Sequence, residues 1–170
     1  RWYTYDRDPE LARGCIVRFN RVRDVIGCGA YDTKAEPGGS EKAGGAIWTP
    51  YYSWAIYFDN APMDTQVYGN ICARNTLGGI MISHWGKNVT VENNIFVDSD
   101  QSQAYLLFAG RMSGIRLRRN IFAYRNPQAD LMRLNLAKDV DLQEIFAEVD
   151  HNLYFPPSGR ALTFSGLPGE

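Results

Sequence analysis

The sequence has few of the residues that build metal centres and disulfide frameworks. Its 170 residues include three cysteines and two histidines, His84 and His151. Cys15, Cys28 and Cys72 are odd in number and lack the close spacing of metal ligands, so we expect buried free thiols and neither a disulfide framework nor a zinc site. We therefore predict no metal and no cofactor.

Long apolar runs and an excess of one charge are also missing. No segment approaches the ~18 apolar residues that cross a membrane as a helix. The formal net charge is −1, with 18 basic and 19 acidic residues interspersed, which argues against a nucleic-acid partner. The first residues, "RWYTYDRDPEL", contain neither an initiator methionine nor a signal peptide. We therefore expect a piece of a longer protein, with the remainder as a possible partner.

What the sequence does contain is a repeat marked by asparagine. Four segments place asparagine directly before Ile or Leu: "TQVYGNICAR", "VTVENNIFVD", "IRLRRNIFAY" and "AEVDHNLYFP". The asparagines are Asn70, Asn94, Asn120 and Asn152, at steps of 24, 26 and 32 residues. A looser copy contains Asn20, 50 residues or about two periods before Asn70. A further short apolar strand comes twelve residues before each of the first three, at Phe58, Ile82 and Phe108.

This repeat predicts an all-β solenoid that occupies residues 1–170 as a single domain. Each unit has three short strands, which we call A ("GIMIS"), B ("VTVEN") and C ("IFVDS"), and a period in the twenties is typical of a β-solenoid. Stacked coils lie about 4.8 Å apart, so asparagines at one corner can satisfy each other as an internal ladder. We expect about five to seven coils, interrupted by a long loop at 29–54 and a short helical insertion at 136–147.

The segments resemble the right-handed parallel β-helix superfamily of carbohydrate-active proteins, which includes pectate lyases, polygalacturonases and many bacterial glycoside hydrolases. The resemblance covers about residues 14–166, and members often carry an asparagine ladder between their second and third strands. "WAIYFDN", "VYGNICAR" and "VENNIFVD" are similar to a group of bacterial β-helix glycoside hydrolases with "WGIYLDD", "GNI" and "HGG-N". Here Asn60 replaces the second Asp, and "SHWGKN" replaces the double-Gly turn. The resemblance implies a secreted, periplasmic or cell-surface protein that acts on a polysaccharide or oligosaccharide.

Alternation of side chains predicts which residues of strand A point outward. Ile56, Phe58, Ile80, Ile82, Leu106 and Phe108 are expected to fill the interior. The outward set is Tyr57, Asp59, Met81, Ser83 and Leu107, with His84 at its end. Solenoids bind extended polymers along such a face. A strict alignment of "DLMRLN" would bury Arg133, so we expect a one-residue slip or bulge there.

Aromatic residues near this strip are candidates for binding sugars, because their flat apolar faces suit the C–H faces of a sugar ring. The predicted substrate-binding residues are Trp48, Tyr51, Tyr52, Tyr57 and Trp85. Trp48 and Tyr51 could equally cap the solenoid edge or pack on another domain, and for Trp54 packing is the preferred interpretation.

Asp59 is the first candidate for catalysis, because its outward position gives no packing reason for a carboxylate. Most glycoside hydrolases use two carboxyl groups, and we predict that Asp98 or Asp100, after strand C, supplies the second. His84 is predicted to orient a carboxylate or bind a sugar hydroxyl. Alternatively, Asp98 pairs with Arg74, and Asp100 is an ordinary turn residue.

The predicted function is thus hydrolysis of a glycan, and two other classes stay open. A polysaccharide lyase would need a strong base and cations on the cleft, and the strip predicted here has few outward Lys or Arg residues. A non-catalytic glycan-binding β-helix, as in adhesins or phage tail proteins, would use the same aromatic residues without the acid pair.

Overall fold

The computed structural model describes residues 13–26, 28–32, 46–51, 54–59, 61–107, 112–136 and 140–166. In 28–32 and 46–51 the description is of the backbone alone.

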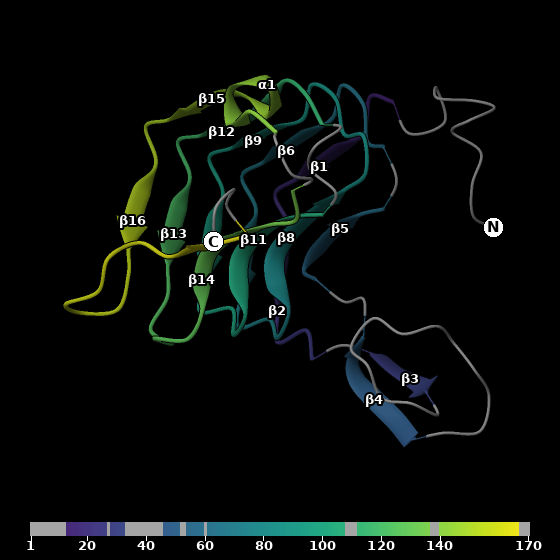
Figure 1. Cartoon of the computed structure of the whole chain (residues 1–170), viewed down its shortest axis with the longest axis vertical. Coiled ribbons are helices and arrows are strands. Elements are labelled where there is room, and N and C mark those ends of the chain that lie inside the picture. The colour runs from purple at the N-terminus through teal and green to yellow at the C-terminus, as the bar shows by residue number, and fades with distance from the viewer. Residues whose placement is uncertain are drawn as a thin grey trace.

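Three parallel sheets of five strands each wind into a parallel β-helix, which confirms the predicted fold class (Figure 1). Sheet A contains β5 (Ile56–Phe58), β8 (Gly78–Ser83), β11 (Ser102–Leu107), β14 (Asp130–Leu134) and β17 (Phe164–Ser165). Sheet B contains β1 (Ile16–Arg18), β6 (Gln66–Tyr68), β9 (Thr90–Glu92), β12 (Ile115–Arg118) and β15 (Phe146–Asp150). Sheet C contains β2 (Arg21–Arg23), β7 (Ile71–Ala73), β10 (Ile95–Val97), β13 (Ile121–Ala123) and β16 (Leu153–Phe155).

The chain passes through the sheets in the order A, B, C, and equivalent residues of successive coils lie in register. Ile95 pairs with Ile71 in the coil before it and with Ile121 in the coil after it. The interpretation of the 50-residue step as two periods is wrong, since β1 pairs directly with β6 and β2 with β7. The extra residues belong to the insertion, which contains the antiparallel pair β3 (Cys28–Asp32) and β4 (Ala46–Tyr51). This pair lies outside the stack of coils (Figure 1).

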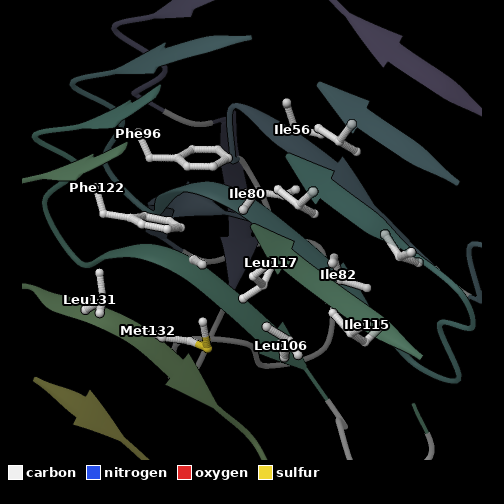
Figure 2. Close-up of a cluster of buried hydrophobic side chains, with 14 of the residues drawn as sticks. Ile56, Ile80, Ile82, Phe96, Leu106, Ile115, Leu117, Phe122, Leu131 and Met132 are labelled. Atoms are coloured by element: carbon white, nitrogen blue, oxygen red, sulfur yellow. The ribbon is translucent and has the colours of Figure 1, made fainter. Parts of the chain in front are cut away.

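The interior of the coils is filled by stacked apolar side chains (Figure 2). The rings of Phe96 and Phe122 stack with centroids 5.2 Å apart, and Phe122 and Tyr154 stack at 5.7 Å. The three rings stack because each belongs to the middle residue of a C strand, and these residues pair in register from one coil to the next. Burying each large apolar side chain stabilises the fold by roughly 1.5–3 kcal/mol.

The alternation predicted for strand A is correct, but one register is wrong by two residues. Ile80, Ile82 and Leu106 are buried in the interior as expected. The partner of Ile82 in the next coil is Leu106 and not Phe108, which lies outside the described residues. The error arises because the turn from strand A to strand B is two residues longer in the later coil. Ser83 and Thr90 are 90 − 83 = 7 positions apart, and their partners Leu107 and Arg116 are 116 − 107 = 9 positions apart.

Arg133 also differs from the expectation. β14 pairs with β11 without a slip, from Ser102 opposite Asp130 to Leu106 opposite Leu134. Arg133 is exposed, and the adjacent Met132 is buried in the interior. The alternation of β14 therefore agrees with its neighbours, and no bulge is needed.

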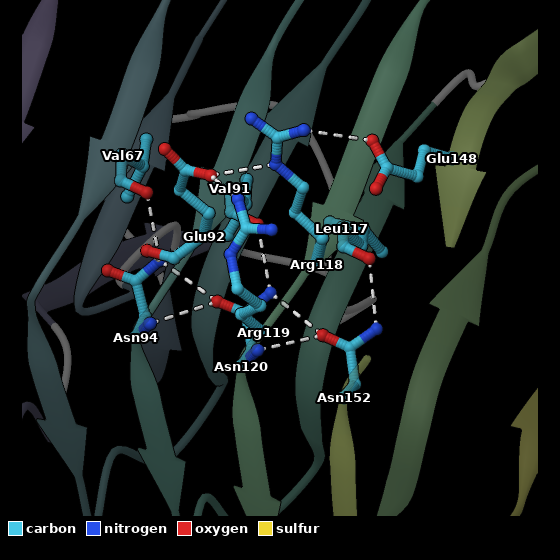
Figure 3. Close-up of polar contacts among 10 residues, drawn as sticks. All are labelled: Val67, Val91, Glu92, Asn94, Leu117, Arg118, Arg119, Asn120, Glu148 and Asn152. Atoms are coloured by element: carbon cyan, nitrogen blue, oxygen red, sulfur yellow. Dashed lines mark hydrogen bonds and ion pairs between the residues drawn. The ribbon is translucent and has the colours of Figure 1, made fainter. Parts of the chain in front are cut away.

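The asparagine ladder runs along the corner between sheets B and C (Figure 3). The Asn94 backbone N–H and Nδ2 both donate to Oδ1 of Asn120, at 3.0 and 3.1 Å. Nδ2 of Asn94 also donates to the Val67 carbonyl oxygen at 2.9 Å. The same bonds to the following asparagine recur at Asn20, Asn70 and Asn120, and the series ends at Asn152. The buried amides are therefore satisfied by one another and by the backbone.

The left-handed backbone at this corner falls on the residue before each ladder asparagine. These residues are Phe19, Gly69, Asn93, Arg119 and His151, with φ between 53° and 66°. Asn93 and Asn94 therefore have separate tasks: Asn93 adopts a conformation that asparagine tolerates, and Asn94 bonds to its neighbours.

One turn of helix lies in the segment where an insertion was expected. It is α1 (Leu142–Ile145), and the side chain of Asp141 accepts a hydrogen bond from the Gln143 N–H at its start. Within the described part of the chain, no helix has the length and apolar character needed to cross a membrane.

Candidate functional site

The outer face of sheet A carries a column of side chains at equivalent positions of four coils. Tyr57 pairs with Met81, Met81 with Tyr105, and Tyr105 with Arg133. These positions alternate with Ile80 and Ile82, which belong to the interior cluster, so the column points away from the core.

Met81 and Ser83 are not part of an exposed strip, because both are fully buried. The ring centroid of Trp54 lies 5.3 Å from that of Tyr57 and 5.9 Å from that of Tyr105. Trp54 therefore packs over Met81, which is the coil neighbour of both tyrosines. Gly78 also lies under Trp54: a Cβ there would come within 2.7 Å of the indole Cδ1. The preferred interpretation of Trp54 as a packing residue agrees with these contacts.

Tyr105 and Arg133 belong to this face and were not among the predicted site residues. The guanidinium of Arg133 lies 5.8 Å from the centre of the Tyr105 ring, within the range of a cation–π contact. Arg133 also donates to Oε1 of Gln101 at 3.1 Å. Alternation alone could have identified Tyr105, because it has the same parity as Leu107.

A second group of candidate residues lies where the strands of sheet A end. Asp59 follows β5 directly, and continuing the register of Phe58 opposite Ile82 places it beside Ser83 of the next coil. His84 and Trp85 follow β8, with φ of 34° and 41°. Two consecutive left-handed residues without glycine store strain that the surrounding structure must hold. Their rings lie 5.9 Å apart.

The imidazole of His84 has a defined environment. Its Nδ1 forms a hydrogen bond with Oγ of Ser83. Partial burial lowers the pKa of His84 below its ordinary value, and the negative charge of Asp59 acts in the opposite direction. The balance favours the neutral ring at pH 7. Asp59 and His84 are thus near enough for the charge of Asp59 to act on the imidazole.

Asp98 pairs with Arg125, and not with Arg74 as the sequence suggested. Its Oδ2 lies 3.0 Å from Nε and 2.7 Å from a terminal nitrogen of Arg125, and the Arg125 backbone N–H donates to its Oδ1. Arg74 instead pairs with Asp24, at 2.7 and 2.8 Å. Asp24, Arg74, Asp98 and Arg125 therefore alternate in charge along the corner between sheets C and A. Asp100 is an exposed turn residue in the same region.

The structure does not bring Asp59 together with Asp98 or Asp100. Asp59 follows the last residue of its A strand, whereas Asp98 and Asp100 precede the first residue of β11. At about 3.3 Å per residue, the five steps of β11 separate the two ends by about 17 Å. The two carboxyl groups of a glycoside hydrolase lie roughly 5 to 9.5 Å apart. The expectation that these loops flank one cleft is therefore wrong, because the full length of strand A lies between them.

Of the remaining predicted site residues, the structure describes the side chains of Tyr57 and Trp85. Tyr57 is partly buried beside Trp54, and Trp85 is partly buried beside His84. Trp48 and Tyr51 lie in β4, where only the backbone is described, and Tyr52 and Asn60 lie outside the described residues. Among the residues that the structure describes, no group of three His, Cys, Asp or Glu side chains could hold a metal ion.

Comparisons with protein-family models, with curated proteins and with solved structures found no match for this chain.

Proposed function

We propose that this protein binds an extended glycan along the outer face of sheet A and hydrolyses a glycosidic bond beside Asp59. The observation that carries the proposal is the continuity of this face. Rings of Tyr57, Trp54 and Tyr105 lie together on it. Asp59 directly follows β5, and His84 directly follows β8. Aromatic faces suit sugar rings, and a polymer can follow the stack across several coils.

Asp59 is the carboxylate best suited to the chemistry. None of the described cations forms a salt bridge with it, in contrast to Asp98, which is held by Arg125. A carboxylate without a fixed cation is available to act as acid, base or nucleophile at a glycosidic bond. His84 lies beside it and can donate or accept a hydrogen bond at a sugar oxygen. The proposal therefore includes Asp59 and His84, and leaves Asp98 and Asp100 out of the reaction.

A polysaccharide lyase is the second candidate, and the outward position of Arg133 favours it more than the sequence did. β-Elimination needs a base that removes the proton next to a uronate carboxyl group, and a cation that stabilises the resulting charge. Arg133 is exposed on sheet A, although Asp130 lies 3.7 Å from its Nε and offsets part of its charge. A neutral His84 is the candidate base.

The test is to incubate the protein with a panel of neutral and acidic polysaccharides. Release of reducing ends without an unsaturated product indicates hydrolysis, ultraviolet absorbance of an unsaturated product indicates elimination, and retention of the protein by an immobilised glycan without turnover indicates a binding protein. We expect Asp59→Asn to abolish the release of reducing ends and to preserve binding. Asp100→Asn is the matched control and should retain activity. Wild-type turnover by Asp59→Asn would exclude the proposed reaction.

A further inference from the structure

Ser83 is a polar residue in a strand that is otherwise buried and largely apolar. All six residues of β8, "GGIMIS", are buried, and Ser83 has no solvent exposure. It lies between the position of Asp59 in one coil and Leu107 in the next. A hydroxyl group in such a place requires a partner, and its partner is Nδ1 of His84.

The direction of this hydrogen bond follows from the needs of the hydroxyl group. A serine hydroxyl has one hydrogen to donate, and a neutral imidazole has one donor nitrogen and one acceptor nitrogen. Nδ1 of His84 is the acceptor that the described residues provide for Ser83. If Nδ1 carried the proton and donated to Oγ, the serine hydrogen would be buried without an acceptor, which is costly. The hydroxyl group therefore donates to Nδ1, and the ring proton lies on Nε2.

We infer that Ser83 is a positioning residue that fixes His84 as the neutral Nε2–H tautomer, so that His84 presents a hydrogen-bond donor and not a base at the Asp59 end of sheet A. The role toward a glycan depends on the proposed function; the tautomer does not. With the proton on Nε2, His84 can donate to a sugar oxygen or to a carboxylate. In this tautomer Nε2 already carries a proton and Nδ1 accepts from Ser83, so neither nitrogen is suited to remove a proton from a substrate. The tautomer therefore also weighs against the lyase.

Among the described residues, burial of His84 acts in the same direction as this assignment, and the charge of Asp59 acts against it. Burial disfavours the charged imidazolium, whereas Asp59 at the end of β5 favours it. The Trp85 ring on the other side carries no charge. Protonation of Nδ1 would turn an acceptor into a donor facing Oγ and would leave the Ser83 hydrogen without its acceptor. Ser83 therefore opposes protonation of the ring in addition to the effect of burial.

The experiment is nitrogen-detected NMR of the histidine rings in the intact chain. The chain has two histidines, and His151→Gln identifies the signals of His84 by difference. We expect wild-type His84 to show an unprotonated Nδ1 and a protonated Nε2 at neutral pH. A proton on Nδ1, or an equal mixture of tautomers, would overturn the inference, and this readout requires no substituted Ser83.

Two variants at Ser83 extend the test. In Ser83→Ala we expect a mixture of tautomers and a higher pKa for His84, and in Ser83→Thr, which retains the hydroxyl, the wild-type tautomer. An unchanged tautomer in Ser83→Ala would show that Ser83 does not set it. If a glycan substrate is found, Ser83→Ala should move the acidic limb of the pH–rate profile to higher pH, and Ser83→Thr should restore it. The wild-type tautomer in a protein without turnover on any glycan would refute the proposed function and leave this inference intact.

Discussion

Two corners of the coil differ in whether successive coils repeat the same residue. The corner between sheets B and C repeats the same residue in every coil, and Asn70, Asn94 and Asn120 are fully buried there with their amides satisfied. The corner that follows β5 and β8 does not repeat: Asp59 is followed in the next coil by Ser83, His84 and Trp85. The difference indicates that the repeated asparagines connect successive coils, and the proposed reaction is assigned to the corner whose residues do not repeat.

The largest expected effect is loss of stability at the repeated corner. Asn94→Ala removes the Oδ1 that accepts from the Asn70 N–H and Nδ2 groups, and it removes the Nδ2 that donates to the Val67 carbonyl oxygen. The buried Asn70 N–H would then have no acceptor, while its Nδ2 group keeps the Val17 and Tyr68 carbonyl oxygens. We therefore expect a loss of about 2–4 kcal/mol in the free energy of unfolding. Urea denaturation followed by circular dichroism measures it.

Asn93→Gly is the matched control for this variant. Asn93 is exposed and has a φ of 53°, which glycine adopts without cost. We expect its free energy of unfolding to differ from wild type by about 0.5 kcal/mol or less. If the two neighbouring substitutions were equally destabilising, the ladder would not be what holds this corner.

At the unrepeated corner the expected effect is on activity instead of stability. Asp59→Asn should abolish turnover and change the free energy of unfolding by about 0.5 kcal/mol or less, since no described cation pairs with Asp59. Glycan hydrolysis measures the expected loss of turnover, and urea denaturation of the same preparation measures the free energy of unfolding. A strongly destabilised Asp59→Asn protein would mean that this corner is structural as well.

The buried thiol of Cys72 gives a prediction about access to the interior of the coils. Burial raises the pKa of Cys72 to about 12. Cys15 is exposed, so the expectation of a buried thiol is correct for Cys72 and wrong for Cys15. In a Cys28→Ser background we expect Cys15 to react rapidly with a thiol reagent and Cys72 to react only on unfolding. Rapid labelling of Cys72 in the native protein would contradict the packing of the C strands.

His84 predicts a modest dependence of stability on pH. Its pKa is lowered in the folded state, so the unfolded chain binds more protons once the pH falls below the ordinary value of 6.5. Stability should therefore be complete above that pH and decline below it. Thermal unfolding of wild type and His84→Gln between pH 5 and pH 8 (roughly the range in which histidine titrates) should show a shallower acidic decline in the variant. Identical profiles would remove His84 as a source of the decline.

The smallest effect is expected for the ion pairs on the outer surface. Arg125 is highly exposed where it contacts Asp98, and exposed pairs contribute about 0–1 kcal/mol. Arg125→Ala should therefore change the free energy of unfolding little, and less in high salt. A loss comparable to that of Asn94→Ala would show that surface pairs share the role of the ladder.

The fold could be predicted from the sequence because stacking requires the same residue at the same corner. The steps between Asn70, Asn94, Asn120 and Asn152 survive insertions of different length, since each insertion lies in another turn. The register of β11 could not be predicted, because the sequence does not show which turn contains the two additional residues. For the same reason the 50-residue step before Asn70 does not show whether it contains one coil with an insertion or two coils.

The site was harder to predict because it depends on contacts between distant parts of the chain. Alternation correctly predicted that Tyr57 and Met81 point away from the core, but it could not show that Trp54 covers Met81. Asp98 and Asp59 lie in neighbouring coils, but the length of strand A separates them, and the repeat alone does not show this. Asp59 and His84 lie near each other because each directly follows an A strand of two neighbouring coils.

A crystal structure of Asp59→Asn with a bound oligosaccharide tests the central claim most directly. We expect the glycan to cross sheet A with sugar rings on Tyr57 and Tyr105, and a glycosidic oxygen beside the substituted position and His84. A glycan bound at the Asp98 and Arg125 end, on sheet B or on sheet C would contradict the assignment of chemistry to the unrepeated corner.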